Sequence, residues 1–218
     1  MTLKKASFLI IAILLVDQIS KIYIKTHFEL NESYQIFPWF KIFFVENEGM
    51  AWGTRISDFL PFVSEQIAKI SLTIFRIVAL VGIGFWLYNS VLKQNNNFLI
   101  IAISLVFAGA LGNIIDSVFY GVFFDDSLGQ VARFLPEQGY ATLLHGKVVD
   151  MLYFPLWKGY LPEWIPFLGG KYFTFFDPVF NIADVAISLG FIMFIVFYRK
   201  VFGKPQTPKE EIEEGVIQ

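Results

Sequence analysis

Four long apolar stretches constrain this chain more than any other feature of its sequence. They cover residues 6–24, 70–92, 98–120 and 180–201 of 218, and each approaches the ~20 residues that a helix needs to cross a bilayer. Hydrocarbon offers the backbone no hydrogen-bond partner, so a spanning segment of this kind has to be helical. We therefore predict a mainly α-helical membrane protein with four transmembrane helices.

The composition agrees with lipid as part of the solvent. Hydrophobic residues make up 56% of the chain and charged residues only 17%, against about a quarter in soluble domains. Lysine and arginine together (17) do not exceed aspartate and glutamate (19), so nothing indicates binding of nucleic acid. The absence of cysteine excludes disulfides, thiolate metal ligands and cysteine nucleophiles.

The basic residues next to the predicted spans indicate how the chain is oriented. They are dense at the two ends and in the link after residue 92, and sparse in the links 25–69 and 121–179, so both termini should be cytoplasmic. The first stretch also resembles a signal peptide, but residues 16–20 show no cleavage pattern of small residues. We expect one integral membrane domain over 1–218, with outer-side links and a cytoplasmic tail at 202–218.

The two outer links are rich in aromatic residues. Residues 34–45 are typical of a strand, although Pro38 limits them to a sheet edge or a break. Further aromatic residues lie among proline and glycine, as expected at the headgroup level of a membrane: Trp157, Tyr160, Trp164 and Tyr172. We predict a small periplasm-side β-sheet with interfacial aromatic loops.

Polar residues inside the spans are candidates for function. Asp17 and Lys21 lie four apart on one helix face and can pair, but Lys21 and Lys25 could instead extend to the outer interface. Asn113 and Asp116 also share a face, and act in the simplest interpretation as contacts between helices.

Two carboxylates stand out on the outer side. Asn181 is a natural N-cap for the fourth span, which places Asp184 in the first helical turn, and Asp150 lies alone in an apolar run. Two carboxylates close together tend to share one proton, so one can activate a water and the other can protonate a leaving nitrogen. The positive helix end favours ionised Asp184, which leaves Asp150 as the proton holder. With only His27 and His145 available as histidines, we expect no metal site and no cofactor.

Five short motifs in order resemble those of the lipoprotein signal peptidases, also called signal peptidase II. They occupy residues 16–21 (VDQISK), 47–53 (NEGMAWG), 109–116 (GALGNIID), 148–150 (VVD) and 180–184 (FNIAD). The resemblance implies an aspartic endopeptidase of the bacterial inner membrane. It would cut signal peptides from diacylglyceryl-modified prolipoproteins just before the lipidated cysteine, and it would act as a monomer in contact with membrane lipid.

The resemblance also assigns roles to residues. It implies that Asp150 and Asp184 are the catalytic pair and that Asn113 and Asn181 hold the carboxylates and the substrate backbone. The remaining motif positions would shape or support the lipid and peptide pocket: Asp17, Lys21, Asn47, Gly49, Ala51 and Asp116.

The chain departs from the family pattern in two places. Ser117 follows Asp116 where the family commonly has arginine, so another cation is expected to compensate: Arg76, Arg133 or Lys147. The stretch between Asp116 and Asp150 is long, which makes Asp125 an alternative to Asp150, and we interpret this stretch as a lid at the lipid surface.

Two functions of other classes compete with the protease. A transporter or proton relay would use Asp17, Lys21, Asn113 and Asp116 as a polar track through the membrane. A structural subunit would use its aromatic links for assembly, and loss of the carboxylates would then affect assembly alone.

Overall fold

Long helices dominate the structure, a computed structural model that describes residues 1–48, 64–175 and 177–202. The three longest elements are α1 (Leu3–His27), α3 (Glu65–Leu92) and α4 (Asn97–Ile115). Each begins with a side-chain oxygen that accepts a hydrogen bond from a first-turn N–H, supplied by Thr2, Ser64 and Asn96 respectively. In the described part of the chain, three helices are long and apolar enough to cross a membrane, and they contain the first three predicted stretches.

The predicted fourth span differs from its expected form. Its helix α6 (Ile182–Val196) has 15 residues, and α7 (Tyr198–Phe202) follows after Phe197 leaves the helical conformation. The span was expected to begin at residue 180, but Val179–Phe180 form strand β6 instead. At ~1.5 Å per residue, α6 is about 22 Å long and shorter than the ~30 Å hydrocarbon core.

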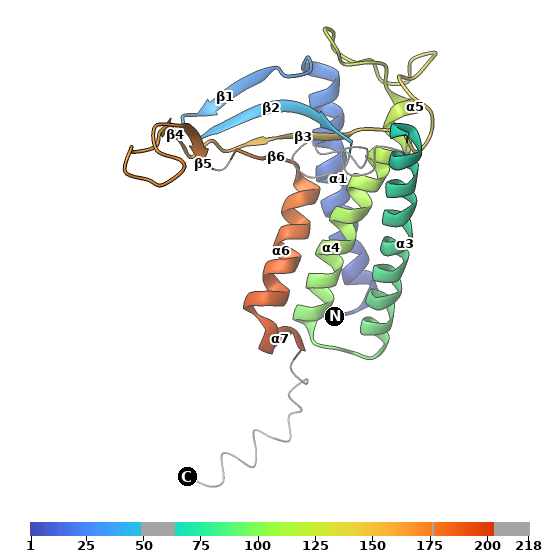
Figure 1. The fold of residues 1–218 in the computed structure, drawn as a ribbon. Helices are drawn as coiled ribbons and strands as arrows, with labels where there is room; N and C mark the ends of the chain where they lie inside the picture. Colours follow the sequence, from blue (N-terminus) through green and yellow to red (C-terminus); the bar gives the residue numbers. More distant parts are fainter. Residues whose placement is uncertain (49–63, 176, 203–218) are drawn as a thin grey trace.

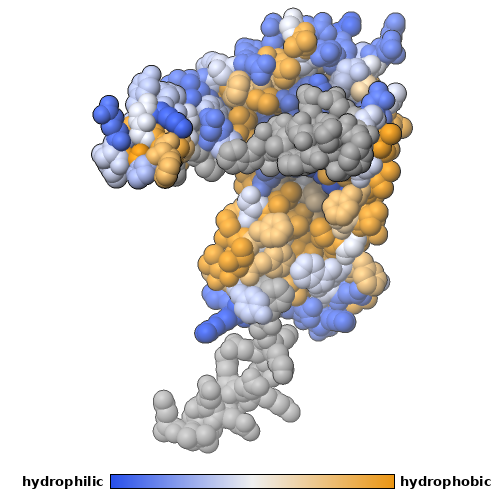
Figure 2. Space-filling model, in the orientation of Figure 1, coloured by the Kyte–Doolittle hydropathy of each residue, from blue (hydrophilic) through white to orange (hydrophobic). Residues whose placement is uncertain are grey.

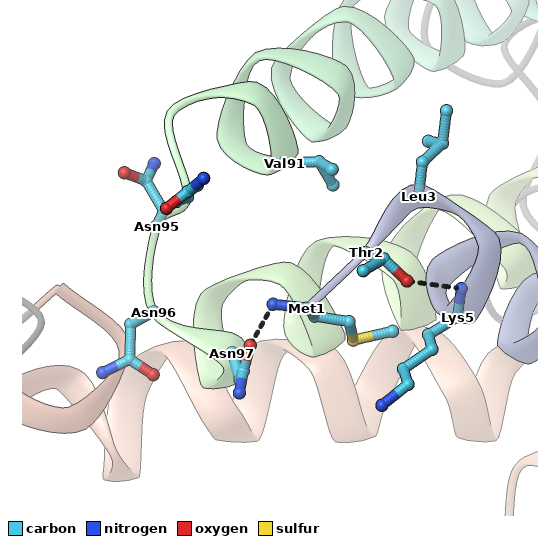
Figure 3. A pocket seen from close by; sticks show the side chains of 9 residues that line it. Met1, Thr2, Leu3, Lys5, Val91, Asn95, Asn96 and Asn97 are labelled. Atoms are coloured by element: carbon cyan, nitrogen blue, oxygen red, sulfur yellow. Dashed lines mark hydrogen bonds between the residues drawn. The ribbon is translucent and has the colours of Figure 1, made fainter.

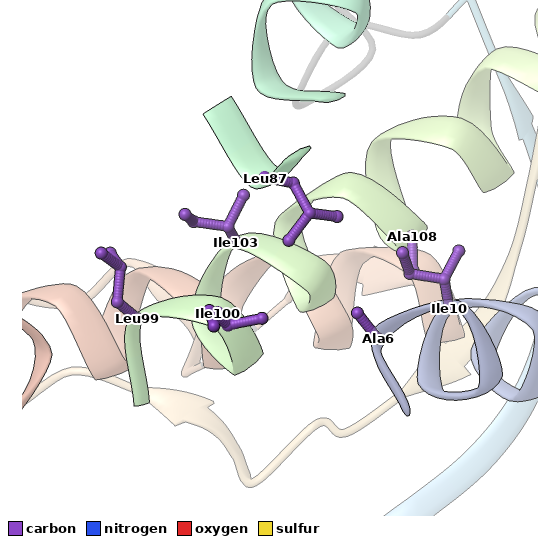
Figure 4. Packing of buried hydrophobic residues seen from close by; sticks show 7 residues of the cluster. All are labelled: Ala6, Ile10, Leu87, Leu99, Ile100, Ile103 and Ala108. Carbon is purple, nitrogen blue, oxygen red and sulfur yellow. The ribbon is translucent and has the colours of Figure 1, made fainter. Parts of the chain in front are cut away.

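Helix α4 lies at the centre of the bundle, where it packs against α1, α3 and α6 (Figure 1). A Cβ atom at Gly109 would lie 2.2 Å from the carbonyl oxygen of Ala183, and one at Gly112 would lie 2.7 Å from a carboxylate oxygen of Asp17. These two glycines therefore allow α4 to approach α6 and α1 closely, as their sequence context indicated. Toward the N-terminal end of α1, the same helices bury an apolar cluster around Ile100 and Ile103 (Figure 4).

A four-stranded antiparallel sheet lies across the end of the bundle where α1 ends and α6 begins (Figure 1). Its order is β1 (Ser33–Phe37), β2 (Phe40–Asn47), β3 (Val148–Tyr153) and β6. The sheet confirms the strand predicted at 34–45, which Pro38 divides into β1 and β2. Strand β3 is almost entirely buried, so the sheet places residues 148–153 directly above the helices.

The long segment after Asp116 is buried in part, while Leu128, Leu135 and Leu143 within it are exposed, so its role as a lid stays a prediction. It starts with a π-helical turn (Asp116–Tyr120) and the short helix α5 (Gly121–Phe123). Tyr120, Phe124 and Ala132 are buried with Phe44 of β2 in a second apolar cluster. A segment that contributes core residues to the junction of sheet and bundle is a structural support.

The helices carry an apolar outer surface between two more polar ends (Figure 2). Exposed large side chains of this surface include Phe75, Val81, Phe85 and Ile195. The N-terminus and α7 lie at the end of the bundle opposite the sheet (Figure 1). A polar hollow there is lined by the N-terminal residues and the turn between α3 and α4, where the amino group of Met1 contacts Asn97 (Figure 3).

Candidate active site

Asp184 lies in the first turn of α6, next to the sheet. Its backbone N–H donates to Asn181 Oδ1 over 2.9 Å, and its carboxylate accepts from the backbone N–H of Asn181 over 3.2 Å. These reciprocal bonds form a capping box, which confirms Asn181 as the N-cap. The second carboxylate oxygen accepts from Asn113 Nδ2 over 2.8 Å, so both oxygens of Asp184 are held in fixed positions.

Asp150 projects from the middle of β3 and is only 5% exposed. One carboxylate oxygen accepts from Asn181 Nδ2 over 2.7 Å, and the other accepts from the side-chain amide of Asn47. Asn47 is the last residue of β2, and the register that pairs it with Val148 brings it to Asp150. Burial raises the pKa of Asp150 to about 7, and the negative charge of Asp184 adds to the rise.

Asn181 connects the two carboxyl groups. Its side-chain amide nitrogen contacts Asp150 and the carbonyl oxygen of Val149, while its backbone N–H contacts Asp184. The same amide nitrogen also donates to Asn113 Oδ1 over 3.1 Å. Two carboxyl groups from distant parts of the chain therefore share one asparagine at the sheet-side end of the bundle.

A buried ion cluster lies beneath this pair. Lys21 Nζ is 2.9 Å from Asp17, 2.8 Å from Asp116 and 2.9 Å from Asn113 Oδ1. All three charged side chains are fully buried. The predicted pairing of Asp17 with Lys21 is confirmed, and the alternative in which Lys21 and Lys25 extend to the interface is wrong because both are 0% exposed.

The ion cluster contacts the backbone beside each of the two carboxylates. Asp17 accepts from the N–H of Ala183 over 2.8 Å, one residue before Asp184. Asp116 accepts from the N–H of Val149 over 3.4 Å, one residue before Asp150. The cluster can thus fix the start of α6 relative to β3. Its members bond to one another in one compact group, which argues against the polar track of a transporter.

The structure also identifies the cation that neutralises Asp116. That cation is Lys21, whereas Arg133 pairs with Asp125 over 2.7 Å and Lys147 lies 3.5 Å from Glu46. Arg133 and Lys147 thus pair with other carboxylates and not with Asp116. Arg76, on α3, is half-buried and lies within electrostatic range of Asp184.

Asp125, the alternative to Asp150, lies in a different environment. Its carboxylate accepts from the backbone and the side chain of Arg133, which is 81% exposed. These bonds lower the pKa of Asp125. The structure thus brings Asp150, rather than Asp125, to Asn181 and the first turn of α6.

The sequence interpretation missed two contributors to this region. Gln18 donates to Asp17 and to Asp116, each over 3.0 Å, and accepts from the hydroxyl of Tyr120. Lys25 contacts Glu46 and also donates to Ser127 over 2.8 Å. The position of Lys25 one turn after Lys21 on the same helix face was the available signal.

Two predicted site residues, Gly49 and Ala51, lie outside the described residues. The other predicted positions occupy one connected region under the sheet. It consists of Asp17, Lys21, Asn47, Asn113, Asp116, Asp150, Asn181 and Asp184.

Known proteins resemble this chain over almost its full length. The model of the family described as signal peptidase (SPase) II matches residues 9–200. A protein named lipoprotein signal peptidase from Porphyromonas gingivalis ATCC 33277 is 43% identical over 218 residues, which cover 99% of this chain and 92% of that protein. The protein of the same name from Amoebophilus asiaticus is 35% identical, with coverage of 98% and 86%.

Solved structures agree with the fold. A bacterial membrane enzyme determined by the in meso method at 1.9 Å resolution aligns with a TM-score of 0.57 and 26% sequence identity. The alignment covers 90% of this chain and 93% of that chain. A second structure with a similar description, at 2.3 Å resolution, also has a TM-score of 0.57, at 24% identity.

Proposed function

The chain belongs to the signal peptidase II family, and from this premise we propose that it removes signal peptides from bacterial prolipoproteins. The substrate is a precursor that carries a diacylglyceryl group, and the bond cut is the one before the lipidated cysteine. The observation that carries the proposal is the shared contact of Asp150 and Asp184 with Asn181, at the membrane-surface end of the bundle.

In the proposed mechanism, Asp150 and Asp184 divide the acid and base roles. Asp184, at the positive end of α6, takes a proton from a water molecule, whose oxygen forms a bond to the carbonyl carbon of the peptide. Asp150 holds a proton near neutral pH because its pKa is about 7, and it donates this proton to the leaving nitrogen when the C–N bond breaks. The reaction uses no metal and no covalent intermediate, and we propose no cofactor.

The remaining motif residues support this pair. Asn113 and Asn181 orient the carboxylates through the bonds already described, and Asn47 holds Asp150 from the sheet. The ion cluster of Asp17, Lys21 and Asp116 fixes the backbone next to each aspartate. We assign Gly49 and Ala51 to the lipid and peptide pocket by their motif positions.

We further propose a four-span topology in the inner membrane, with both termini cytoplasmic and the active site on the outer side. Three helices meet the length and composition of spans, and α6 runs beside α4 in the same bundle. A short fourth span can be accommodated by local thinning of the bilayer. The N-terminus and α7 share one end of the bundle, which supports a common side, and the basic residues favour the cytoplasm (Figure 1). We propose that a single copy is the active unit.

Cleavage of a lipidated precursor by purified variants tests the proposal. Asp150→Asn and Asp184→Asn should each lose cleavage while their thermal unfolding in detergent shows a folded protein. Asp125→Asn is the matched control and should cleave like the wild type, because that carboxylate pairs with Arg133. Retained cleavage in either of the first two variants, or loss in the control, would contradict the assignment.

A further inference from the structure

A separate β-hairpin extends from the protein beside the four-stranded sheet. It consists of β4 (Trp157–Tyr160), β5 (Tyr172–Phe175) and the turn 161–171, here called the lateral hairpin. Among the residues that the structure describes, strands β4 and β5 pair only with each other and form their own two-stranded sheet. The lateral hairpin projects sideways beyond the helices, and its tip lies level with the start of α6 (Figure 1).

The tip of the lateral hairpin presents large apolar side chains. Phe167 is 95% exposed and Trp164 is 80% exposed, and Leu168 beside them is 47% exposed. Phe167 also has a φ of 66°, in the left-handed region that is an outlier for a bulky residue. An isolated two-stranded hairpin is only marginally stable in water, so this element needs another surface to contact.

The backbone of the tip is nevertheless well organised. Gly170 N–H donates to the carbonyl of Leu161 over 2.9 Å, and Gly169 N–H donates to the carbonyl of Ile165 over 2.9 Å. A Cβ atom at Gly169 would lie 2.5 Å from the carbonyl oxygen of Glu163, so the turn is tightly closed. An ordered turn that displays aromatic side chains is suited to contact with an apolar layer.

The two faces of the lateral hairpin differ in chemistry. The register places Trp157 and Phe173 on one face, because Gly159 pairs with Phe173. Tyr160 and Tyr172 pair across the other face, with ring centroids 5.4 Å apart. Lys158 lies in β4 and Lys171 ends the turn, which contains one acidic residue, Glu163. Tryptophan, tyrosine and lysine are the residues typical of the zone between lipid headgroups and acyl chains.

We propose that the lateral hairpin docks on the outer lipid surface of the membrane that contains the helices, with Trp164 and Phe167 inserted at the headgroup level. Three observations support lipid as the occupant. The tip lies level with the start of α6, Trp164 and Phe167 of the tip are almost fully exposed, and two lysines of the hairpin complement anionic headgroups. The hairpin would then fix the height of the β3–α6 connection relative to the bilayer.

Site-directed spin labelling of the full chain tests this proposal, because the natural sequence contains no cysteine. The variants Phe167→Cys and Leu128→Cys are labelled with a nitroxide and reconstituted in vesicles of phosphatidylcholine and phosphatidylglycerol. Leu128 is the matched control, since it is 73% exposed in the segment between α5 and β3, whose loops extend from the sheet away from the helices (Figure 1). Val81→Cys, on the lipid-facing side of α3, provides the reference for a label inside the bilayer.

Collisions with oxygen, which concentrates in lipid, and with a water-soluble nickel complex distinguish the outcomes. The label at position 167 should favour oxygen several-fold over the label at 128 and approach the value at 81. A label at 167 that behaves like the one at 128 would overturn the proposal, and so would protection from both reagents, which indicates a second copy as the occupant. Quenching of tryptophan fluorescence by brominated lipid checks the result without a cysteine. The variant Trp164→Phe should lose part of the quenching that the wild type shows. Unchanged quenching in this variant would count against docking.

Discussion

Replacement of Asp150 by asparagine should abolish cleavage and, at alkaline pH, stabilise the protein. Burial and the charge of Asp184 raise the pKa of Asp150 from 3.8 to about 7. The folded protein therefore binds this proton more tightly than the unfolded chain, and the free energy of unfolding falls as the pH rises from about 4 to about 7. At 1.36 kcal/mol per pKa unit, the loss amounts to about 4 kcal/mol, and it is complete above pH 7.

Asparagine avoids this loss because it does not ionise, but it introduces a cost of its own. Its oxygen can still accept from Asn181, whereas its amide nitrogen would face the amide nitrogen of Asn47. Two opposed donors in a buried site cost about 1–3 kcal/mol. We therefore expect Asp150→Asn to be less stable than the wild type at pH 4 and more stable by about 1–3 kcal/mol at pH 8.

Thermal unfolding in detergent across a pH series measures this crossover. Asp125→Asn provides the control, because the pKa of that carboxyl is lowered by Arg133, and its loss should bring no gain at pH 8. A stability difference between Asp150→Asn and the wild type that is constant from pH 4 to pH 8 would refute a raised pKa at this site. A difference that favours the variant at low pH would refute the sign.

Three further predictions concern activity and packing. The kcat/KM for a lipidated precursor should fall as the pH rises through about 7, because Asp150 then loses the proton it donates; a pH profile that is flat to pH 9 would contradict its role as the acid. Lys25→Met should lower the free energy of unfolding by about 3–5 kcal/mol, because Glu46 then keeps a buried, poorly compensated charge. The double variant Lys25→Met, Glu46→Gln should recover part of that loss in thermal unfolding. Gly109→Ala should destabilise the protein by about 1–3 kcal/mol, because the added Cβ would meet the α6 backbone. Gly82→Ala, which has open space around it, should leave the stability unchanged. Equal effects of the two variants in unfolding assays would argue against tight α4–α6 packing.

Local features of the site could be predicted from the sequence because they depend on short spacings along one helix. Asp17 and Lys21 lie four residues apart, so any helix through them brings their side chains together. Asn181 and Asp184 stand at the distance that a capping box requires. The same holds for the first three spans, whose length and apolar content are sufficient to identify them.

Contacts between distant segments could not be predicted in this way. Lys21 bonds to Asp116, directly after α4, as well as to Asp17, and this contact depends on how closely the glycines of α4 let the helices approach. The core residues of the segment after Asp116 could not be predicted either, because they are separated in sequence and reach the core only through the fold. The length of α6 was also decided by context, since pairing with β3 converts the start of the apolar stretch into a strand.

The sequence alone thus determined that the chain is a bundle of apolar helices with acidic residues near one end, because the bilayer imposes helix length and composition directly. Tertiary structure decided which acids meet. Asp150 reaches Asn181 and the neighbourhood of Asp184 because β3 pairs with β2 and β6 in one particular register. A shift of that register by one residue would turn the Asp150 side chain to the opposite face of the sheet, and no spacing along the chain encodes it.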